Sequence, residues 1–276
     1  MTKWNLGFLL SAAYALGFLA WSAPAAFAQD AGAKPEAKAT VAAQDSPVAA
    51  AASLRVALDD IAAQFEKKNG GKIKISYGAT GNLVRQIEEG APFELFLAAD
   101  EASVARLEKN GKTDGAPAAL VDGLLAVVAP TGSAVKVDGD LAGLKQALAD
   151  GTVKHISIAN PELAPYGKAA REALTKAGLW EQVQPLLVQG ENIGQAAQYV
   201  TTGAAEVGLV AQSLLFAPDV ASKVTQAPVN ASFYSPIRQG FALLKNASAS
   251  TKAFHAFLTT PEASAVFEKN GFKIPK

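Results

Sequence analysis

Residues 72–100 read KIKISYGATGNLVRQIEEGAPFELFLAAD, and the rest of the chain repeats their pattern. KIKISY alternates polar and apolar residues, as a half-buried strand does. A turn at 78–82 leads into the amphipathic segment LVRQIEEG, and the apolar run at 94–99 is a second, buried strand. Asp100 is placed to cap a helix at 101–110. Strand, helix and strand in this order predict a parallel β-α-β unit.

The same alternation extends in both directions along the chain. We expect a strand at 48–52 and then a helix from Leu54, with Ser53 as its N-cap. Further strands are expected at 124–130, 155–159, 207–211 and 240–244, and further helices at 141–149, 168–177, 193–201, 251–258 and 262–270. The pattern restarts near 124 and again near 236. The residues alone leave two arrangements open: one continuous doubly wound sheet, or two lobes between which the chain crosses twice.

Composition excludes several classes of function. Lys and Arg together number 25, as do Asp and Glu, so the formal charge is zero. Nucleic-acid binding is not expected, because it usually shows as a basic excess. The chain contains no cysteine, which excludes thiol nucleophiles, Cys-based zinc sites and disulfides. His155 and His255 each lack a second ligand at metal-binding spacing.

The first 28 residues are typical of a secretory signal peptide. Lys3 precedes an apolar run that extends to Trp21, and AFA at 26–28 has the small-x-small pattern of a cleavage site. A permanent anchor is the alternative, although the run is short for a span of ~20 residues. Residues 29–46 are rich in Ala, Lys, Glu and Pro, which predicts a flexible linker.

Small and hydroxyl-bearing residues gather where the expected strands end and helices begin. In parallel sheets, ligands bind beyond the carboxyl ends of strands, where helix N-termini present free N–H groups. These junctions are nearly devoid of Lys and Arg; they are 52–53, 78–82, 98–100, 160–167 and 190–193.

Uncharged donors of this kind suit an ionised oxyanion, whose oxygens only accept hydrogen bonds. No junction pairs a nucleophile with a base, as a hydrolytic enzyme requires. The turn GATGN also lacks the third glycine of a dinucleotide fingerprint. Taken singly, Ser53 and Thr80 would be ordinary helix caps, so only their convergence would make a site.

Four separate segments together resemble the periplasmic molybdate-binding proteins of molybdate ABC importers. They are AAASL at 50–54, the run at 78–100, ANPELAPYGKAAREAL at 159–174 and FEKNGF at 267–272. The resemblance covers the chain from about residue 48 to its end. It implies an α/β, two-lobed periplasmic-binding-protein fold of type II, in which each lobe is a mainly parallel sheet flanked by helices and the ligand lies in the cleft. Lobe 1 would comprise 47–126 and 236–276, and lobe 2 would comprise 127–235.

The resemblance also implies the site residues. The contacts it carries over are hydroxyls or backbone groups of Ser53, Thr80, Ala99, Tyr166 and Ile193. Ser53, Thr80 and Ile193 would touch molybdate or tungstate as an oxyanion and not as a bare cation, and no other cofactor is implied. Some relatives use a tyrosine just after the strand VGLV, where this chain has Ala211. Others use a tyrosine in the APYG segment, which is Tyr166 in this chain. We therefore assign the tyrosine donor to Tyr166 and exclude Ala211.

Together these features predict a monomeric periplasmic binding protein that is not an enzyme. It would capture molybdate, and tungstate as well, and deliver it to the membrane permease of an ABC importer. Two alternatives remain: a binding protein for another oxyanion such as sulfate or phosphate, and a secreted α/β enzyme. The enzyme alternative requires His155 to lie in the cleft beside Ser53 or Thr80.

Overall fold

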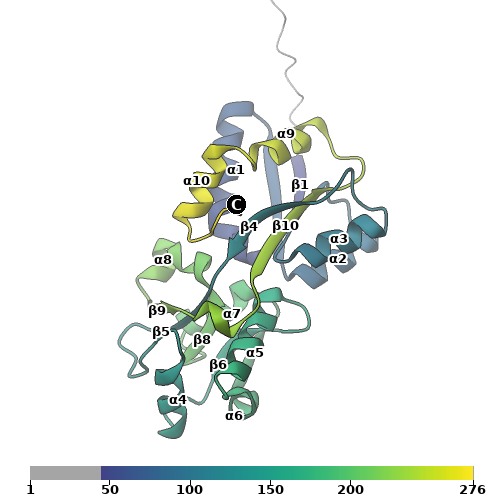
Figure 1. Ribbon diagram of the computed structural model, residues 1–276. Coiled ribbons are helices and arrows are strands. Elements are labelled where there is room, and N and C mark those ends of the chain that lie inside the picture. Colours follow the sequence, from purple (N-terminus) through teal and green to yellow (C-terminus); the bar gives the residue numbers. More distant parts are fainter. Residues whose placement is uncertain (1–44, 276) are drawn as a thin grey trace, which may run out of the picture. The chain divides into compact units, whose positions relative to one another are not determined.

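Two five-stranded sheets organise the computed structural model, which describes residues 45–275 (Figure 1). In spatial order, the first contains β2 (Lys72–Gly78), β1 (Asp45–Ala51), β3 (Leu95–Ala98), β10 (Ile237–Leu243) and β4 (Ala118–Gly123). The second contains β7 (Leu187–Gly190), β6 (Ile156–Ala159), β8 (Val207–Ala211), β5 (Leu125–Pro130) and β9 (Val224–Pro228). In each sheet one strand, β10 or β5, runs antiparallel to both of its neighbours. The predicted α/β class, with two sheets flanked by helices, is therefore confirmed, and both sheets are mixed.

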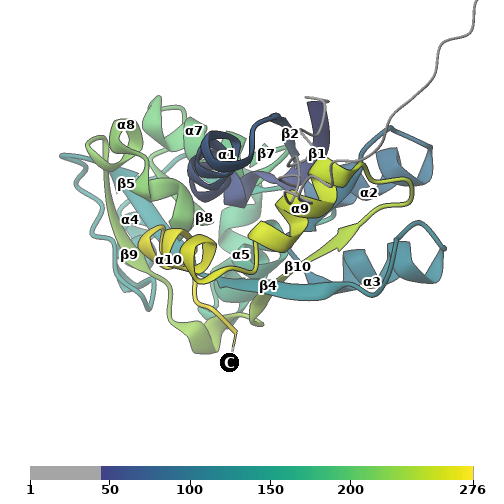
Figure 2. The same cartoon turned by 90° about the horizontal axis from the view of Figure 1, so that it is seen from above.

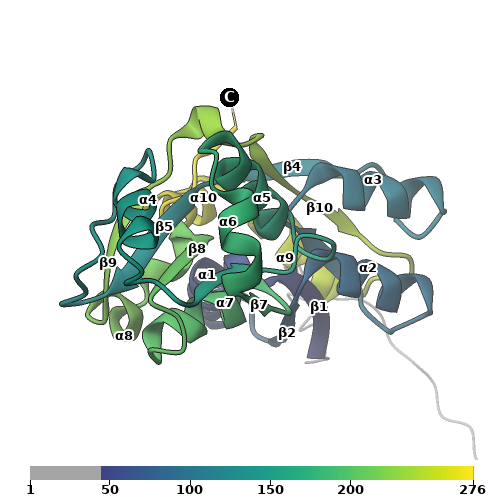
Figure 3. The same ribbon diagram turned by 90° about the horizontal axis from the view of Figure 1, so that it is seen from below.

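Helices flank both sheets. Those beside the first sheet are α1 (Arg55–Asn69), α2 (Thr80–Glu88), α3 (Glu101–Lys109), α9 (Ala249–Phe257) and α10 (Pro261–Lys269). The others are α4 (Ala142–Ala149), α5 (Pro165–Lys176), α6 (Trp180–Val183), α7 (Ile193–Thr201) and α8 (Pro218–Ala221). Four 3₁₀ turns within the described residues complete the set: η1 (Ala52–Leu54), η2 (Gln184–Leu186), η3 (Gln212–Phe216) and η4 (Ala231–Phe233). Figure 2 shows α9 and α10 beside α1, and Figure 3 shows α5 and α7 beside the second sheet.

Both faces of the first sheet are buried, which explains its apolar strands. Val48 of β1 belongs to the same core cluster as Leu58 of α1. Its neighbour Ala49 points to the opposite face, into a cluster with Leu83 of α2 and Leu107 of α3. Successive residues of the strand thus serve different helices.

Three strands were not expected from the sequence: β4, β7 and β9. All three lie at sheet edges. An edge strand has only one neighbouring strand and is partly exposed, so its residues need less apolar character; in β9 only Val224 is buried. The apolar pattern of these three segments was therefore too weak to indicate strands.

The chain crosses between the sheets twice, once from β4 to β5 and once from β9 to β10 (Figure 1). The described residues all belong to one compact unit. β5 begins at Leu125, two residues before the predicted start of the second lobe. The lobe boundaries at 126/127 and 235/236 stay a prediction.

At the N-terminal end of the described residues, β1 begins at Asp45, so the last two residues of the predicted 29–46 linker belong to a strand. The rest of that linker and the predicted signal peptide at 1–28 lie outside the described residues. Among the helices that the structure describes, none combines the length and apolar character that a membrane span requires.

Candidate functional site

A small cavity lies beyond the carboxyl ends of β1, β2 and β3. It is lined by Ala51, Ala52, Ser53, Gly78, Ala79, Thr80, Ala99, Ala164, Pro165, Tyr166 and Ile193. All five residues that the sequence singled out are in this set. Its empty space of about 190 Å³ is smaller than that of the open pocket described below. None of these lining residues, all within the described part of the chain, is charged.

Four helical segments begin at this cavity. Thr80 and Ile193 are the first residues of α2 and α7, Pro165 is the first of α5, and η1 leads directly into α1. The first N–H groups of a helix have no partner within it, and they carry the positive end of the helix dipole. In α7, Asn192 caps the N–H groups of Gly194 and Gln195 and leaves that of Ile193 outside the cap. The N-termini of these helical segments together supply positive electrostatic potential at the cavity without a cationic side chain.

Ser53 is not the helix cap that its sequence position indicates. The turn η1 moves the start of α1 forward, so that Leu54 is its N-cap and no side chain caps it. The fully buried Ser53 hydroxyl instead donates to Oε1 of Gln239 across 3.4 Å. Its carbonyl oxygen accepts the hydroxyl of Ser213, at 2.7 Å. This pair of bonds holds Ser53 at the cavity wall.

Thr80 and Ala99 act as a pair. The Ala99 N–H donates to the Thr80 hydroxyl oxygen at 3.0 Å. Because that oxygen accepts, the hydroxyl hydrogen of Thr80 remains free to donate to something else. The bond uses the Ala99 amide within the protein. The direct backbone contact predicted for Ala99 therefore stays a prediction, and this geometry does not favour it.

Tyr166 lies in the first turn of α5, which begins at Pro165, three residues earlier than expected. Its side chain is only 1% exposed. Burial raises the pKa of Tyr166, the neighbouring Tyr234 adds to the rise, and hydrogen bonds involving Ser53 and Gln239 only partly offset it. The phenol is thus a neutral donor. Ala211, the position excluded as a ligand, is buried at the end of β8 and pairs with Leu125.

Sequence reasoning missed Gln239. This amide lies in β10, is fully buried, and donates through Nε2 to the Tyr166 hydroxyl at 3.1 Å. Ile237 and Phe241, two residues before and two residues after it in the strand, are also buried. A Gln at an inward position of an apolar strand was the available signal, since a buried amide needs partners.

Two hydrogen bonds join segments that lie next to the cavity-lining residues. The Gly81 N–H of α2 donates to the carbonyl of Leu163, which precedes α5, at 2.9 Å. Beside it, the Asn82 amide donates to the Glu191 carboxylate at 2.8 Å. These bonds join residues near the first sheet to residues near the second. The structure thus shows the two sides in contact around the cavity.

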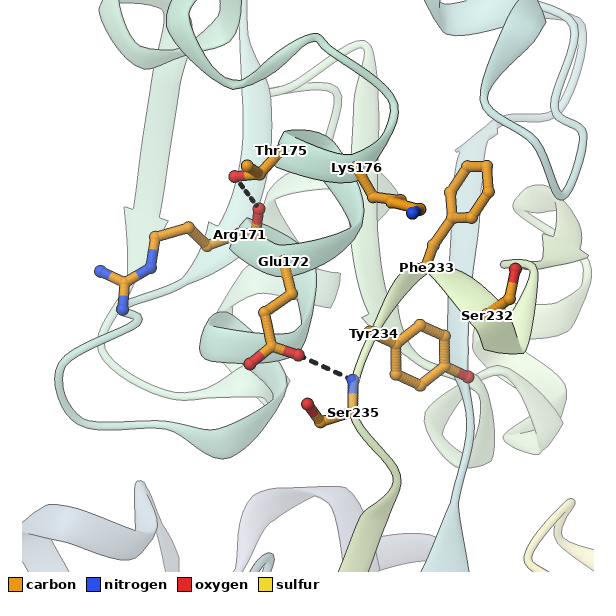
Figure 4. Close-up of a pocket in the computed structure, with 8 residues that line it drawn as sticks. All are labelled: Arg171, Glu172, Thr175, Lys176, Ser232, Phe233, Tyr234 and Ser235. Carbon is orange, nitrogen blue, oxygen red and sulfur yellow. Dashed lines mark hydrogen bonds between the residues drawn. The ribbon is translucent and has the colours of Figure 1, made fainter.

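A larger, open pocket lies between α5 and the segment before β10 (Figure 4). Its lining includes Arg171 and Lys176, but also Glu172, whose carboxylate accepts the Ser235 N–H at 2.7 Å. In Figure 4 Lys176 extends toward Phe233, while Arg171 points away from it. Its charges are of both signs, and it offers an anion no enclosed set of donors.

His155 does not lie beside Ser53 or Thr80, as the enzyme alternative requires. It lies just before β6, at the opposite end of that strand from the cavity, with Nδ1 3.6 Å from Glu206. Across residues 45–275, His, Asp and Glu form no group of three that could hold a metal ion.

The comparisons with known proteins agree with this geometry. The sequence model of the family described as bacterial extracellular solute-binding protein matches residues 47–273. Molybdate-binding protein ModA of Azotobacter vinelandii is 40% identical over 228 residues, which are 82% of this chain and 88% of that protein. The putative ABC transporter substrate-binding lipoprotein YvgL of Bacillus subtilis is 31% identical, over 82% of this chain and 85% of its own. Among solved structures, the periplasmic molybdate-binding protein of Azotobacter vinelandii aligns with a TM-score of 0.75 and 30% identity, over 84% of this chain and 100% of that one.

Proposed function

The chain belongs to the bacterial extracellular solute-binding protein family, and on that basis we propose that it captures molybdate and delivers it to an ABC importer. Membership in a family of binding proteins also confirms the expectation that the chain is not an enzyme. The relatives of similar length are a molybdate-binding protein and a putative ABC transporter substrate-binding lipoprotein, which supports both the ligand and the membrane partner.

One observation carries the proposal. Ser53, Thr80 and Tyr166, which bear hydroxyls, and Ile193, whose N–H begins a helix, all line one small cavity that charged side chains do not line. A hydrogen bond to a charged group contributes ~1.5–3 kcal/mol. Four such bonds give roughly 6–12 kcal/mol before the costs of association. Micromolar binding requires about 8.2 kcal/mol net, so we expect the N–H groups of the helix N-termini to contribute as well.

Selectivity follows from the same donors. Molybdate and tungstate are fully ionised tetrahedral anions at neutral pH, so each of their oxygens accepts. Protonated phosphate carries a hydrogen that would face donors only, and this costs affinity. Sulfate is fully ionised but smaller, so we expect discrimination against it to depend on how closely the donors fit the larger anion.

Thermal unfolding with molybdate, tungstate, sulfate and phosphate, at equal ionic strength, tests the proposal. A ligand at about 100 times its Kd adds about 2.7 kcal/mol of stability. For a chain of this size we expect a rise in Tm of roughly 5–11 °C with molybdate and tungstate. No rise with either anion, or a larger rise with sulfate or phosphate, contradicts the proposal.

The proposed site of action is the periplasm, with residues 1–28 removed on export. Mass spectrometry of the protein recovered from a periplasmic fraction should show a mature chain that begins after Ala28. Recovery of the uncut chain from the cytoplasmic fraction alone contradicts this location.

A further inference from the structure

We propose that Gln239 is a positioning residue of the anion site, which holds the hydroxyl of Tyr166 as a donor toward the bound anion. This inference rests on the function proposed above. Gln239 does not line the cavity itself, but it contacts two residues that do, Ser53 and Tyr166. It therefore acts through them.

The direction of the bond to Tyr166 is the main argument. An amide nitrogen can only donate, so the Gln239 Nε2–Tyr166 bond at 3.1 Å makes the phenol oxygen an acceptor. The single hydrogen of the phenol is then left for another acceptor. Tyr166 is almost completely buried and borders the cavity, so an anion there is an acceptor within its reach.

The second contact of Gln239, with the Ser53 hydroxyl, is weak enough to be replaced by a bond from Ser53 to the anion. The bond from the Ser53 hydroxyl to Oε1 is 3.4 Å long, at the weak end of the hydrogen-bond range. The Ser53 hydrogen can leave this bond for a charged oxygen, whose bond is stronger. Gln239 thus orients Tyr166 firmly and Ser53 loosely.

The local backbone makes room for this arrangement. Gly123, at the end of β4, pairs with Ile237 of β10. A Cβ on Gly123 would lie 2.0 Å from the Tyr166 hydroxyl oxygen and 2.8 Å from Nε2 of Gln239. The ladder between β10 and β4 also shifts register directly after Gln239. Amide and phenol therefore meet where the backbone carries no side chain.

Two substitutions separate positioning from packing. Gln239→Met keeps an unbranched side chain of similar length but cannot hydrogen-bond strongly. Gln239→Glu is nearly isosteric, yet its carboxylate accepts only, so it draws the Tyr166 hydrogen away from the cavity and adds a negative charge behind the site. We expect the Kd for molybdate at pH 8 to rise about tenfold in Gln239→Met and about 100-fold or more in Gln239→Glu.

The control is Thr251→Val in α9. Thr251 is fully buried and hydrogen-bonds to Glu94, outside the cavity, so this variant loses a buried bond of a similar kind. It should lower Tm and leave the Kd unchanged. A purely structural role of Gln239 predicts instead that the isosteric Glu variant binds as well as the Met variant or better.

A double-mutant cycle with Tyr166→Phe completes the experiment, all Kd values being measured by calorimetric titration of molybdate. Because Gln239 acts mainly through the phenol, Gln239→Met should weaken binding by less than about threefold in the Tyr166→Phe background. The inference is overturned if both Gln239 variants bind within about twofold of wild type, or if the full tenfold loss persists without the phenol. Failure of the wild-type protein to bind molybdate would instead contradict the proposed function.

Discussion

Gly123→Ala should damage the anion site although position 123 does not line it. The added Cβ would meet the Tyr166 hydroxyl oxygen at 2.0 Å, whereas ordinary contacts begin at 3.4 Å. Tyr166 is buried and held by Gln239, so it can yield only by tilting α5 or by pushing its hydroxyl out of place. Gly123 is not among the described residues with positive φ, so the backbone itself tolerates alanine.

The expected cost has two parts. Overpacking of a buried site lowers the free energy of unfolding by ~1–3 kcal/mol. A displaced Tyr166 hydroxyl would lose the bond to the anion that we propose for it, worth ~1.5–3 kcal/mol, so the Kd for molybdate should rise about 10- to 150-fold. Thermal unfolding of the ligand-free protein measures the first part, and calorimetric titration measures the second.

Gly90→Ala is the matched control. Gly90 has φ of 95° and open space around its α-carbon, so alanine there strains the backbone far from the cavity and should lower Tm without changing the Kd. If Gly123→Ala proves too unstable to study, the double variant with Tyr166→Phe removes the clashing oxygen and should recover part of the stability. Unchanged affinity in Gly123→Ala would refute this reasoning.

Three further predictions concern the hydroxyl donors and the response to pH. Ser53→Ala should raise the Kd for molybdate about 10- to 150-fold in calorimetric titration, because a bond to a charged oxygen is lost; wild-type affinity would remove Ser53 from the site. Because burial raises the pKa of Tyr166, its phenol stays protonated at pH 10. Titrations of molybdate between pH 7 and 10 should therefore give a constant Kd. A Kd that climbs steadily from pH 8 would contradict a protonated Tyr166 donor. The raised pKa also makes the contribution of Tyr166 to the free energy of unfolding depend on pH. This contribution is fully present below the ordinary tyrosine pKa of about 10 and is lost as pH rises from there toward the pKa in the folded state. Burial alone would raise the pKa of Glu94, but hydrogen bonds from Ser248 and Thr251 lower it overall, so its stabilising effect is lost as pH falls through that lowered value. Glu94→Gln should therefore flatten the acid side of the stability curve measured by urea unfolding, and an unaltered curve would exclude Glu94 as a cause.

The convergence of the site could be predicted because it follows from topology. Ser53 and Thr80 follow neighbouring parallel strands, so their helices begin at the same edge of the first sheet. Tyr166 and Ile193 lie in helices that follow the neighbouring parallel strands β6 and β7, so these helices likewise begin at one edge of the second sheet. Alternation of strands and helices in the sequence placed the junctions after β1, β2 and β6, whereas the junction at Ile193 was placed from its helix alone because β7 was not expected. The arrangement in two lobes came from the resemblance.

The details that sequence reasoning missed depend on contacts between distant residues. Gln239 reaches Ser53 from 186 positions away in the sequence, and only the folded sheet brings β10 beside the first strand–helix junction. Ser53 failed as a cap because a single 3₁₀ turn displaced the start of α1. The sequence likewise contained no sign that the Ala99 N–H donates to the Thr80 hydroxyl, and the backbone contact of Ala99 with the ligand stays a prediction.

The anomalous signal of tungsten in a crystal grown with tungstate would locate the anion itself. We expect one strong peak in the cavity lined by Ser53, Thr80, Tyr166 and Ile193, within hydrogen-bonding distance of the three hydroxyls. A peak in the open pocket beside Arg171, or no ordered peak at saturating tungstate, would contradict the assignment of this cavity as the oxyanion site.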